Sequence, residues 1–237
     1  MTYEHQNAYK RFFYHARYNA VLKALDPRPG ELVLDIGCGT GYYVGGIAKA
    51  GATAVGIDLA PNYVRQASEY ITRNTNASAP HHVAAAEAKH LPFGNATFDK
   101  VLMTEVLEHL IDYPRSLEEI SRILKPSGRA VITTPSKYSP LNLAYHWKAH
   151  RRKYAFHEHI VELTPGKFEQ EMHQYFHGVR LSFANFLVPY PVDMVAERVV
   201  SPTAARGLAW AEQVCQRLPI LRRAGWTMIA IGRKPQR

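Results

Sequence analysis

The chain has 237 residues, of which 46% are hydrophobic and 21% charged, which suits one domain with a large core. No apolar run approaches the roughly 18 residues of a membrane-spanning helix, and the first residues lack the apolar stretch of a secretion signal, so we expect a cytoplasmic protein. The two cysteines, Cys38 and Cys215, are too few for a disulfide framework and are predicted to be free thiols.

The formal net charge of +9 is unevenly distributed along the chain. Residues 31–134 hold nine Lys or Arg and eleven Asp or Glu, whereas residues 137–153 hold five and none, and residues 201–237 hold seven and one. Such a basic surplus is typical of a protein that meets an acidic substrate, a membrane surface or a nucleic acid. It is equally compatible with a role in solubility alone, so the charge pattern leaves these alternatives open.

Hydrophobic patterning predicts strands that alternate with helices. The predicted strands are residues 32–36, 54–57, 81–86, 98–103, 130–133, 178–184 and 226–232, and the predicted helices are residues 5–25, 42–50, 61–73, 114–124, 165–176 and 203–217. Alternation of this kind is typical of an α/β fold with a doubly wound sheet. We expect a Rossmann-like, mostly parallel, seven-stranded sheet with one antiparallel strand near the C-terminus.

A glycine-rich segment follows the first predicted strand. Gly37, Gly39 and Gly41 allow a tight turn and a close approach of a ligand to the backbone. Their spacing is G-x-G-x-G, whereas dinucleotide-binding enzymes use G-x-G-x-x-G. Asp35 precedes the loop, where a carboxylate would repel a pyrophosphate but attract an ammonium group. The pattern therefore disfavours a dehydrogenase.

Two further acids follow the next predicted strands. Asp58 ends the second strand, where an acid can accept hydrogen bonds from both hydroxyls of a ribose. Glu87 and Ala88 follow the third strand, where the edge of an adenine would lie. The Glu87 carboxylate could accept a hydrogen bond from the adenine amine, or it could be a solvated loop acid.

Five segments resemble the successive motifs of class I S-adenosylmethionine-dependent methyltransferases. They are most similar to the branch that contains quinone-biosynthesis methyltransferases and many small-molecule relatives. The resemblance covers about residues 30–135, and its specificity comes from five motifs in the correct order. The segments are residues 33–41 (VLDIGCGTG), 56–60 (GIDLA), 87–93 (EAKHLPF), 98–109 (FDKVLMTEVLEH) and 120–128 (ISRILKPSG).

This resemblance implies S-adenosylmethionine as the cofactor and S-adenosylhomocysteine as its product. It implies one domain over residues 1–237, with a helical lid at 1–30, a cofactor-binding half at 31–135 and a substrate-side half at 136–237. Many relatives have Asp where Glu87 stands, and Ser127 replaces a commoner Gly. The cofactor-binding residues that the resemblance implies are Tyr18, Asp35, Gly37, Cys38, Gly39, Asp58, Leu59, Glu87, Ala88 and Thr104.

A cluster of polar residues follows the fourth predicted strand. The spacing of Glu105, Glu108 and His109 would place them on one face of a helix. Three roles are open: a metal site that His157 or His159 completes, a metal-free base at His109, or a structural role. Of these we select His109 as the catalytic candidate, and we expect no metal.

The acceptor side is predicted to be aromatic and basic. Residues 136–160 include Tyr138, Tyr145, His146 and Trp147, which could wall an aromatic or lipidic pocket. The helix predicted at 203–217 has an apolar face that would join the core or cover the cleft, and the arginines after it leave contact with a membrane surface open. The predicted substrate-binding residues are Tyr14, Glu105, Tyr138 and His146.

The predicted function is methyl transfer to a small-molecule acceptor, which could be aromatic, acidic or lipid-like. Transfer from a sulfonium is an in-line displacement, so the protein chiefly supplies alignment and exclusion of water. An RNA methyltransferase is an alternative that uses the basic surplus, but residues 104–107 (TEVL) lack the N/D-P-P-Y turn of amino-directed enzymes. A non-catalytic cofactor-binding subunit is the other alternative, and both a monomer and a homodimer are compatible with the sequence.

Overall fold

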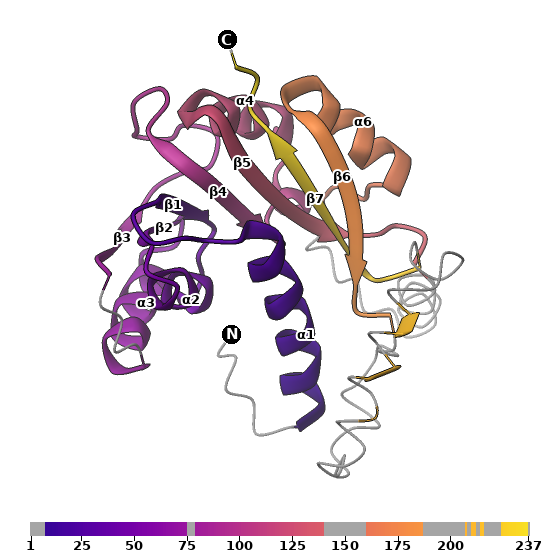
Figure 1. The fold of residues 1–237 in the computed structure, drawn as a ribbon, viewed down its shortest axis with the longest axis horizontal. Helices are drawn as coiled ribbons and strands as arrows, with labels where there is room; N and C mark the ends of the chain where they lie inside the picture. Colours follow the sequence, from indigo (N-terminus) through magenta and orange to yellow (C-terminus); the bar gives the residue numbers. More distant parts are fainter. Residues whose placement is uncertain are drawn as a thin grey trace.

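The computed structural model describes residues 8–74, 79–139, 160–186, 207, 210–211, 214–215 and 224–236. In these ranges strands and helices alternate over much of the chain (Figure 1). The strands are β1 Leu32–Ile36, β2 Thr53–Asp58, β3 His81–Ala85, β4 Phe98–Thr104, β5 Leu124–Pro135, β6 His177–Ala184 and β7 Thr227–Arg233. The helices are α1 Ala8–Leu25, α2 Tyr42–Lys49, α3 Pro61–Asn74, α4 Tyr113–Ile123, α6 Pro165–Tyr175 and the short 3₁₀ turn η1 Leu107–His109.

All seven strands form one sheet in the order β3-β2-β1-β4-β5-β7-β6. Strands β1 to β5 pair in parallel, and β7 pairs antiparallel with both β5 and β6. The predicted α/β sheet, mostly parallel with one antiparallel strand near the C-terminus, is therefore confirmed. The strand order reverses direction at β1 and β4, which is the position where ligands bind in doubly wound folds.

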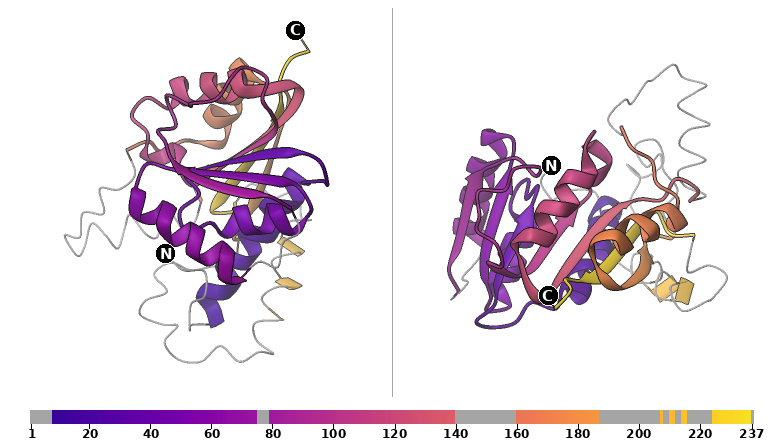
Figure 2. Two further views of the ribbon diagram at one scale, coloured as in Figure 1. Left: turned by 90° about the vertical axis from the view of Figure 1, so that its left-hand side faces the viewer. Right: turned by 90° about the horizontal axis from the view of Figure 1, so that it is seen from above.

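Helices cover both faces of the sheet, so that the sheet lies between two helical layers (Figure 2). On one face α1, α2 and α3 pack through side chains such as Val21, Ile47 and Ile71. On the other face α4 and α6 pack through side chains such as Ile120 and Phe168. Two apolar cores result, and the central strands are buried on both sides as expected for a parallel sheet.

Local sequence signals explain where the outer helices begin. Helix α4 has Asp112 as its N-cap, whose side chain accepts a hydrogen bond from the Arg115 backbone N–H, and a proline lies in its first turn. Helix α6 has Thr164 as its N-cap with Pro165 directly after it. A side-chain acceptor at the cap satisfies a backbone N–H that has no partner in the helix, and proline fits the first turn because it lacks that N–H.

The region after β4 differs from the expectation. Glu105, Glu108 and His109 were predicted to share one face of a helix, but Glu105 has a left-handed backbone with φ +53°. Only the short turn η1 follows it, and α4 begins at Tyr113. The helical prediction was therefore wrong here, because a left-handed residue and a 3₁₀ turn, and not an α-helix, follow the strand.

Some predicted features lie outside the described residues. Most of the aromatic and basic segment 136–160 and most of the helix predicted at 203–217 belong to this group, although Gly207, Trp210, Ala211, Val214 and Cys215 have helical backbone. Within the part of the chain that the structure describes, no helix is both long and apolar enough to cross a membrane.

Candidate functional site

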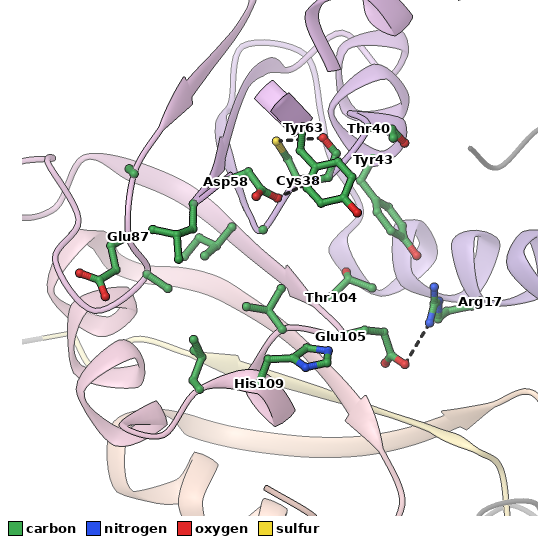
Figure 3. Close-up of a pocket in the computed structure, with 18 of the residues that line it drawn as sticks. Arg17, Cys38, Thr40, Tyr43, Asp58, Tyr63, Glu87, Thr104, Glu105 and His109 are labelled. Atoms are coloured by element: carbon green, nitrogen blue, oxygen red, sulfur yellow. Dashed lines mark hydrogen bonds and ion pairs between the residues drawn. The ribbon is translucent and has the colours of Figure 1, made fainter. Parts of the chain in front are cut away.

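A pocket of about 510 Å³ lies at the carboxyl ends of the parallel strands β1, β2 and β4 (Figure 3). Its volume falls within the range of about 300–1,000 Å³ that is usual for small-molecule sites. The walls come from the loops that follow these strands, from the loop after β3 and from α1. The residues predicted from sequence that line it are Tyr14, Gly37, Cys38, Gly39, Asp58, Leu59, Glu87, Ala88, Thr104, Glu105 and His109.

The glycine-rich loop forms the wall next to β1. Gly37 and Gly39 have positive φ angles of 71° and 51°, a conformation that favours glycine. A Cβ atom at Gly37 would lie 2.2 Å from a methyl carbon of Val106, whereas a Cβ at Gly39 would meet nothing within 4 Å. Gly37 is thus required for packing against the loop after β4, and Gly39 leaves its side of the pocket open to a ligand.

Asp58 at the end of β2 holds this loop in place. One carboxylate oxygen accepts a hydrogen bond from the Gly39 backbone N–H at 2.9 Å, and the other accepts from the Ala60 N–H at 3.0 Å. The backbone N–H groups of Gly37 and Cys38 both donate to the Ile57 carbonyl. The carboxylate of Asp58 therefore lies in the pocket wall with a fixed orientation, as recognition of a ribose requires.

Asp35 lies in β1 next to the loop, is 1% exposed, and is not among the residues that line the pocket. Its Oδ2 atom is buried without a hydrogen-bond partner among the described residues. Burial, together with the nearby Asp58 carboxylate, raises the pKa of Asp35 well above its usual range. A buried acceptor without a partner is costly, so the site suits a ligand that brings a donor or a positive charge.

These observations test the fit of S-adenosylmethionine. Asp35 offers an acceptor for an ammonium, Gly39 leaves room beside the backbone, and Asp58 offers fixed carboxylate oxygens. In addition, the Thr104 hydroxyl oxygen is buried without a hydrogen-bond partner among the described residues. The charges and unsatisfied polar atoms of the pocket therefore fit a cationic, hydroxyl-bearing nucleoside.

The residues predicted for the adenine line the pocket, and Glu87 lies on the far side of it from Arg17 of α1 (Figure 3). Leu59 is 72% exposed, so its apolar surface is accessible to a planar ring. The Glu87 carboxylate forms ion pairs with Lys89 at 3.0 Å and His90 at 3.4 Å. The hydrogen bond from Lys89 is the main reason that the pKa of Glu87 is lowered. Glu87 is thus partly engaged with its own loop, and Ala88 provides the adjacent buried wall.

Glu105 and Arg17 form an ion pair at the other side of the pocket, with 2.9 Å between Arg17 Nη1 and Glu105 Oε2 (Figure 3). The second Glu105 oxygen accepts a hydrogen bond from the Thr133 hydroxyl at 2.8 Å. The Glu105 backbone N–H in turn lies 3.1 Å from that hydroxyl. The guanidinium carbon of Arg17 also lies 5.5 Å from the centre of the Tyr14 ring. This side of the pocket therefore carries a fixed pair of opposite charges.

Glu108 and His109 follow with different environments. Glu108 is 1% exposed and accepts a hydrogen bond from the Thr134 hydroxyl at 3.2 Å. Burial, and secondly the Glu105 charge, raise the pKa of Glu108 well above its usual range. His109 is exposed and lines the pocket near Glu105 (Figure 3). Of the cluster predicted from sequence, His109 and Glu105 thus reach the pocket, while Glu108 anchors the turn.

Tyr18 does not line the pocket, although it was selected for the cofactor. Its ring packs against Tyr42 and Tyr43, with centroids 4.4 and 5.3 Å away, and a Cβ at Gly46 would clash with its hydroxyl. Burial raises the pKa of Tyr18 to about 12. Tyr18 therefore fixes α1 against α2, and the nearby Tyr14 is the helix tyrosine that reaches the pocket.

Two other predicted residues are placed differently. Tyr138 is 61% exposed and is absent from the pocket wall, while His146 lies outside the described residues, as do His157 and His159. Within the described ranges, His, Cys, Asp and Glu form no group of three that could hold a metal ion. Cys38 is a buried free thiol whose pKa is raised by burial, so it contributes apolar surface.

Several lining residues were not found from sequence. Arg17 follows Tyr14 by one helical turn, and that spacing was the signal available for it. Tyr63 lies in the first turn of α3, after the second strand motif. The lining residues that the sequence analysis missed are Arg17, Ile36, Thr40, Tyr43, Tyr63, Ala86, Val106 and Leu110.

Comparison with known proteins matches the central part of the chain. Residues 34–132 match the family model described as a methyltransferase domain. The demethylmenaquinone methyltransferase of Corynebacterium kroppenstedtii is 34% identical over 48% of this chain and 45% of its own length. The O-methyltransferase cnsE of Penicillium expansum is 37% identical over 46% of this chain and 39% of its own length. Each match thus spans less than half of the relative.

The fold is also shared with solved structures. Phosphoethanolamine N-methyltransferase 2 of Haemonchus contortus, solved with S-adenosylhomocysteine, has a TM-score of 0.63 at 20% identity, covering 97% of this chain and 56% of that one. At this identity the likeness concerns the fold, and the family model supplies the independent sequence match. Residues 34–132 therefore match a methyltransferase domain in sequence, and the chain shares its fold with a solved methyltransferase.

Proposed function

We propose that the chain transfers the methyl group of S-adenosylmethionine to a small-molecule acceptor. The observation that carries the proposal is the buried Asp35 carboxylate, which lies beside the glycine loop with an oxygen that has no partner among the described residues. A ligand that brings a hydrogen-bond donor, and above all a cationic one such as an ammonium group, offsets the cost of such a group. The small size of the pocket and the names of the relatives, which include a demethylmenaquinone methyltransferase and an O-methyltransferase, support a small acceptor.

Each wall of the pocket then has a role toward the cofactor. Asp35 would hold the ammonium group, with Gly37, Cys38 and Gly39 beside the methionine part. Asp58 would accept from the ribose hydroxyls, while Thr104 would close over the cofactor after β4. The adenine would lie between Leu59 and the wall at Glu87 and Ala88. Three observations support these assignments. All of these residues except Asp35 line the pocket, and two backbone N–H groups fix the Asp58 carboxylate. Asp35 and Thr104 each have a buried oxygen without a hydrogen-bond partner among the described residues.

When bound, S-adenosylmethionine supplies a methyl carbon that bonds to the acceptor atom as its bond to sulfur breaks and sulfur keeps the electron pair. The residues of the chain align the two partners and exclude water. Helix α1, whose Tyr14 and Arg17 line the pocket, would serve as a lid over the cofactor. If the reacting atom of the acceptor carries a proton, His109 is the candidate base, because its imidazole lines the pocket.

Calorimetric titration with S-adenosylhomocysteine tests the proposal. We expect Asp35→Ala and Asp58→Ala each to weaken binding by at least about tenfold, because hydrogen bonds to charged groups contribute about 1.5–3 kcal/mol. Glu69→Ala is the matched control, since Glu69 is an exposed acid on α3 that forms only a 4.0 Å ion pair with Arg73. Unchanged affinity in both aspartate variants, with unchanged folding by circular dichroism, would contradict the assignment.

A transfer assay separates the acceptor classes. Labelled methyl groups from the cofactor should enter small-molecule extracts and should not enter bulk transfer RNA. Clear labelling of the RNA would instead favour the nucleic-acid alternative. Tight binding of S-adenosylhomocysteine without any methyl transfer would favour a non-catalytic cofactor-binding subunit.

A further inference from the structure

The side of the pocket opposite the adenine wall has its own chemistry, and the inference drawn from it rests on the proposed function. If Asp58, Leu59 and Ala88 hold the nucleoside, the remaining polar walls face the acceptor. Three of them, Arg17, Glu105 and His109, lie together in Figure 3. We call these three residues the acceptor side.

Arg17 is unusual among these residues. It is the one Lys or Arg among the described residues that line the pocket, although the whole chain has a formal charge of +9. Its side chain is only 9% exposed, and arginine is rarely so buried unless it is paired. Arginine also presents a planar set of N–H donors that matches a carboxylate or another oxygen anion. Arg17 therefore lies in the pocket wall and has a side chain suited to binding an oxygen anion.

Glu105 fixes the guanidinium in place. Its carboxylate pairs with Arg17 at 2.9 Å and accepts from the Thr133 hydroxyl at 2.8 Å. To do so, Glu105 adopts a left-handed backbone with φ +53°, which is unfavourable for a residue with a Cβ atom. Strained backbone of this kind persists where the surrounding structure holds it, and it clusters at ligand sites.

The charge on the acceptor side is concentrated in the ion pair of Arg17 and Glu105. Arg17 and Glu105 cancel each other. Burial and the Glu105 charge keep Glu108 toward its neutral form, so Glu108 adds little negative charge. The sulfonium of the cofactor contributes one positive charge. An anionic oxygen beside Arg17 would be attracted by both the guanidinium and the sulfonium, an interaction that an uncharged acceptor lacks.

We propose that the acceptor is an oxygen acid, either a carboxylic acid or an acidic phenol or enol, which binds as its anion with Arg17 holding the anionic oxygen. The new bond forms between that oxygen and the methyl carbon, the carbon–sulfur bond breaks, and sulfur retains the electron pair. Both reacting centres end neutral, so no proton has to be removed during transfer. For such an acceptor Arg17, held by Glu105, determines specificity.

Binding to the complex with S-adenosylhomocysteine tests the proposal with matched probes. The probes are benzoate, benzamide and benzylamine, with the corresponding naphthalene and octyl sets, titrated by calorimetry. We expect the carboxylate of at least one set to bind at least about tenfold more tightly than its amide and its amine. In Arg17→Met the carboxylate should bind about as tightly as its amide and its amine. Arg17→Lys should retain part of the preference for the carboxylate.

Control variants separate recognition from folding. Arg28→Met removes an exposed arginine that pairs with Asp26 far from the pocket, and it should keep the full preference for carboxylates. Because Arg17→Met leaves Glu105 unpaired, the double variant Arg17→Met/Glu105→Met removes both charges, and its affinity for S-adenosylhomocysteine reports whether the pocket is intact. The double variant should also lack the preference for carboxylates.

The outcomes distinguish this inference from the proposed function. Failure of the wild-type protein to bind S-adenosylhomocysteine would overturn both. Binding of S-adenosylhomocysteine with equal or undetectable binding of the acid, amide and amine in every set would overturn the inference alone. Persistence of the preference in the double variant would overturn it as well. Transfer of label from the cofactor to the preferred carboxylate, giving a methyl ester, would support it directly.

Discussion

Asp35 and Glu105 are two carboxylates at the carboxyl ends of neighbouring parallel strands, and their surroundings are opposite. Glu105 has Arg17 and Thr133 as partners for its two oxygens. Asp35 is more deeply buried, and its Oδ2 has no hydrogen-bond partner among the described residues. One acid is satisfied by the protein itself. The other is arranged for a ligand.

The difference shows how one pocket divides two tasks. The Glu105 pair exists without a ligand, so it shapes the acceptor side in advance. The unpaired Asp35 oxygen is a cost that the protein carries until a cation arrives, and the nearby Asp58 charge increases that cost. Burial of an unpaired charge is destabilising. We therefore expect substitution of Asp35 to stabilise the ligand-free protein and to weaken ligand binding. Substitution of Glu105 should reduce both stability and ligand binding.

The largest effect is predicted at Gly37, where the glycine loop packs against the loop that carries Glu105. Gly37→Ala places a methyl group 2.2 Å from a Val106 methyl in a backbone with φ +71°. Overpacking costs about 1–3 kcal/mol and left-handed backbone about 1–2 kcal/mol, so we expect about 2–5 kcal/mol of destabilisation. Thermal unfolding measures it, and the added change Val106→Ala should recover the packing part alone.

Gly39→Ala is the matched comparison for this prediction. Its Cβ would meet nothing within 4 Å, so only the backbone cost of about 1–2 kcal/mol remains. The new methyl would face the pocket, and affinity for S-adenosylhomocysteine should therefore fall in Gly39→Ala. Equal destabilisation by the two alanine substitutions would show that the two loops do not pack as described.

A smaller loss is predicted for Glu105→Gln. The change removes the negative partner of Arg17, whose side chain is 9% exposed, and an uncompensated buried charge is destabilising. Because both side chains keep some contact with water, we expect about 2 kcal/mol, which is a decrease in Tm of roughly 4–8 °C. Glu118→Gln breaks an exposed ion pair with Arg115 and should change Tm by less than about 2 °C. If Glu105→Gln were as stable as the wild type, Glu105 would not be the partner that fixes Arg17.

The two sides of the pocket also differ in how far the sequence predicted them. Asp35, Asp58 and the glycines lie at strand ends within consecutive motifs, so strand prediction alone placed them at one edge of the sheet. The acceptor side joins α1 to the turn after β4. The Arg17–Glu105 ion pair depends on the left-handed backbone of Glu105. The spacing of residues in the sequence does not reveal this conformation, so the helical interpretation of Glu105–His109 was wrong. Arg17 was missed because its partner is distant in sequence.

The smallest effect has the opposite sign and concerns Asp35. Its pKa in the folded state is raised by burial and by Asp58, so the folded, ligand-free protein loses stability as pH rises from the unfolded value of about 3.9 through the raised folded value. Asp35→Asn removes this loss. Without ligand, the variant should match the wild type near pH 4 and exceed its Tm at pH 8 by roughly 2–4 °C, on the order of 1 kcal/mol.

The same Asp35→Asn protein should bind S-adenosylhomocysteine more weakly at pH 8, because the neutral amide lacks the charge that attracts an ammonium. Saturating ligand should therefore reverse the order, so that the wild type becomes the more stable protein. Thermal unfolding at both pH values, with and without S-adenosylhomocysteine, gives all the required comparisons. A variant less stable than the wild type without ligand at pH 8 would mean that Asp35 is satisfied within the protein, as Glu105 is, and the contrast between the two acids would disappear.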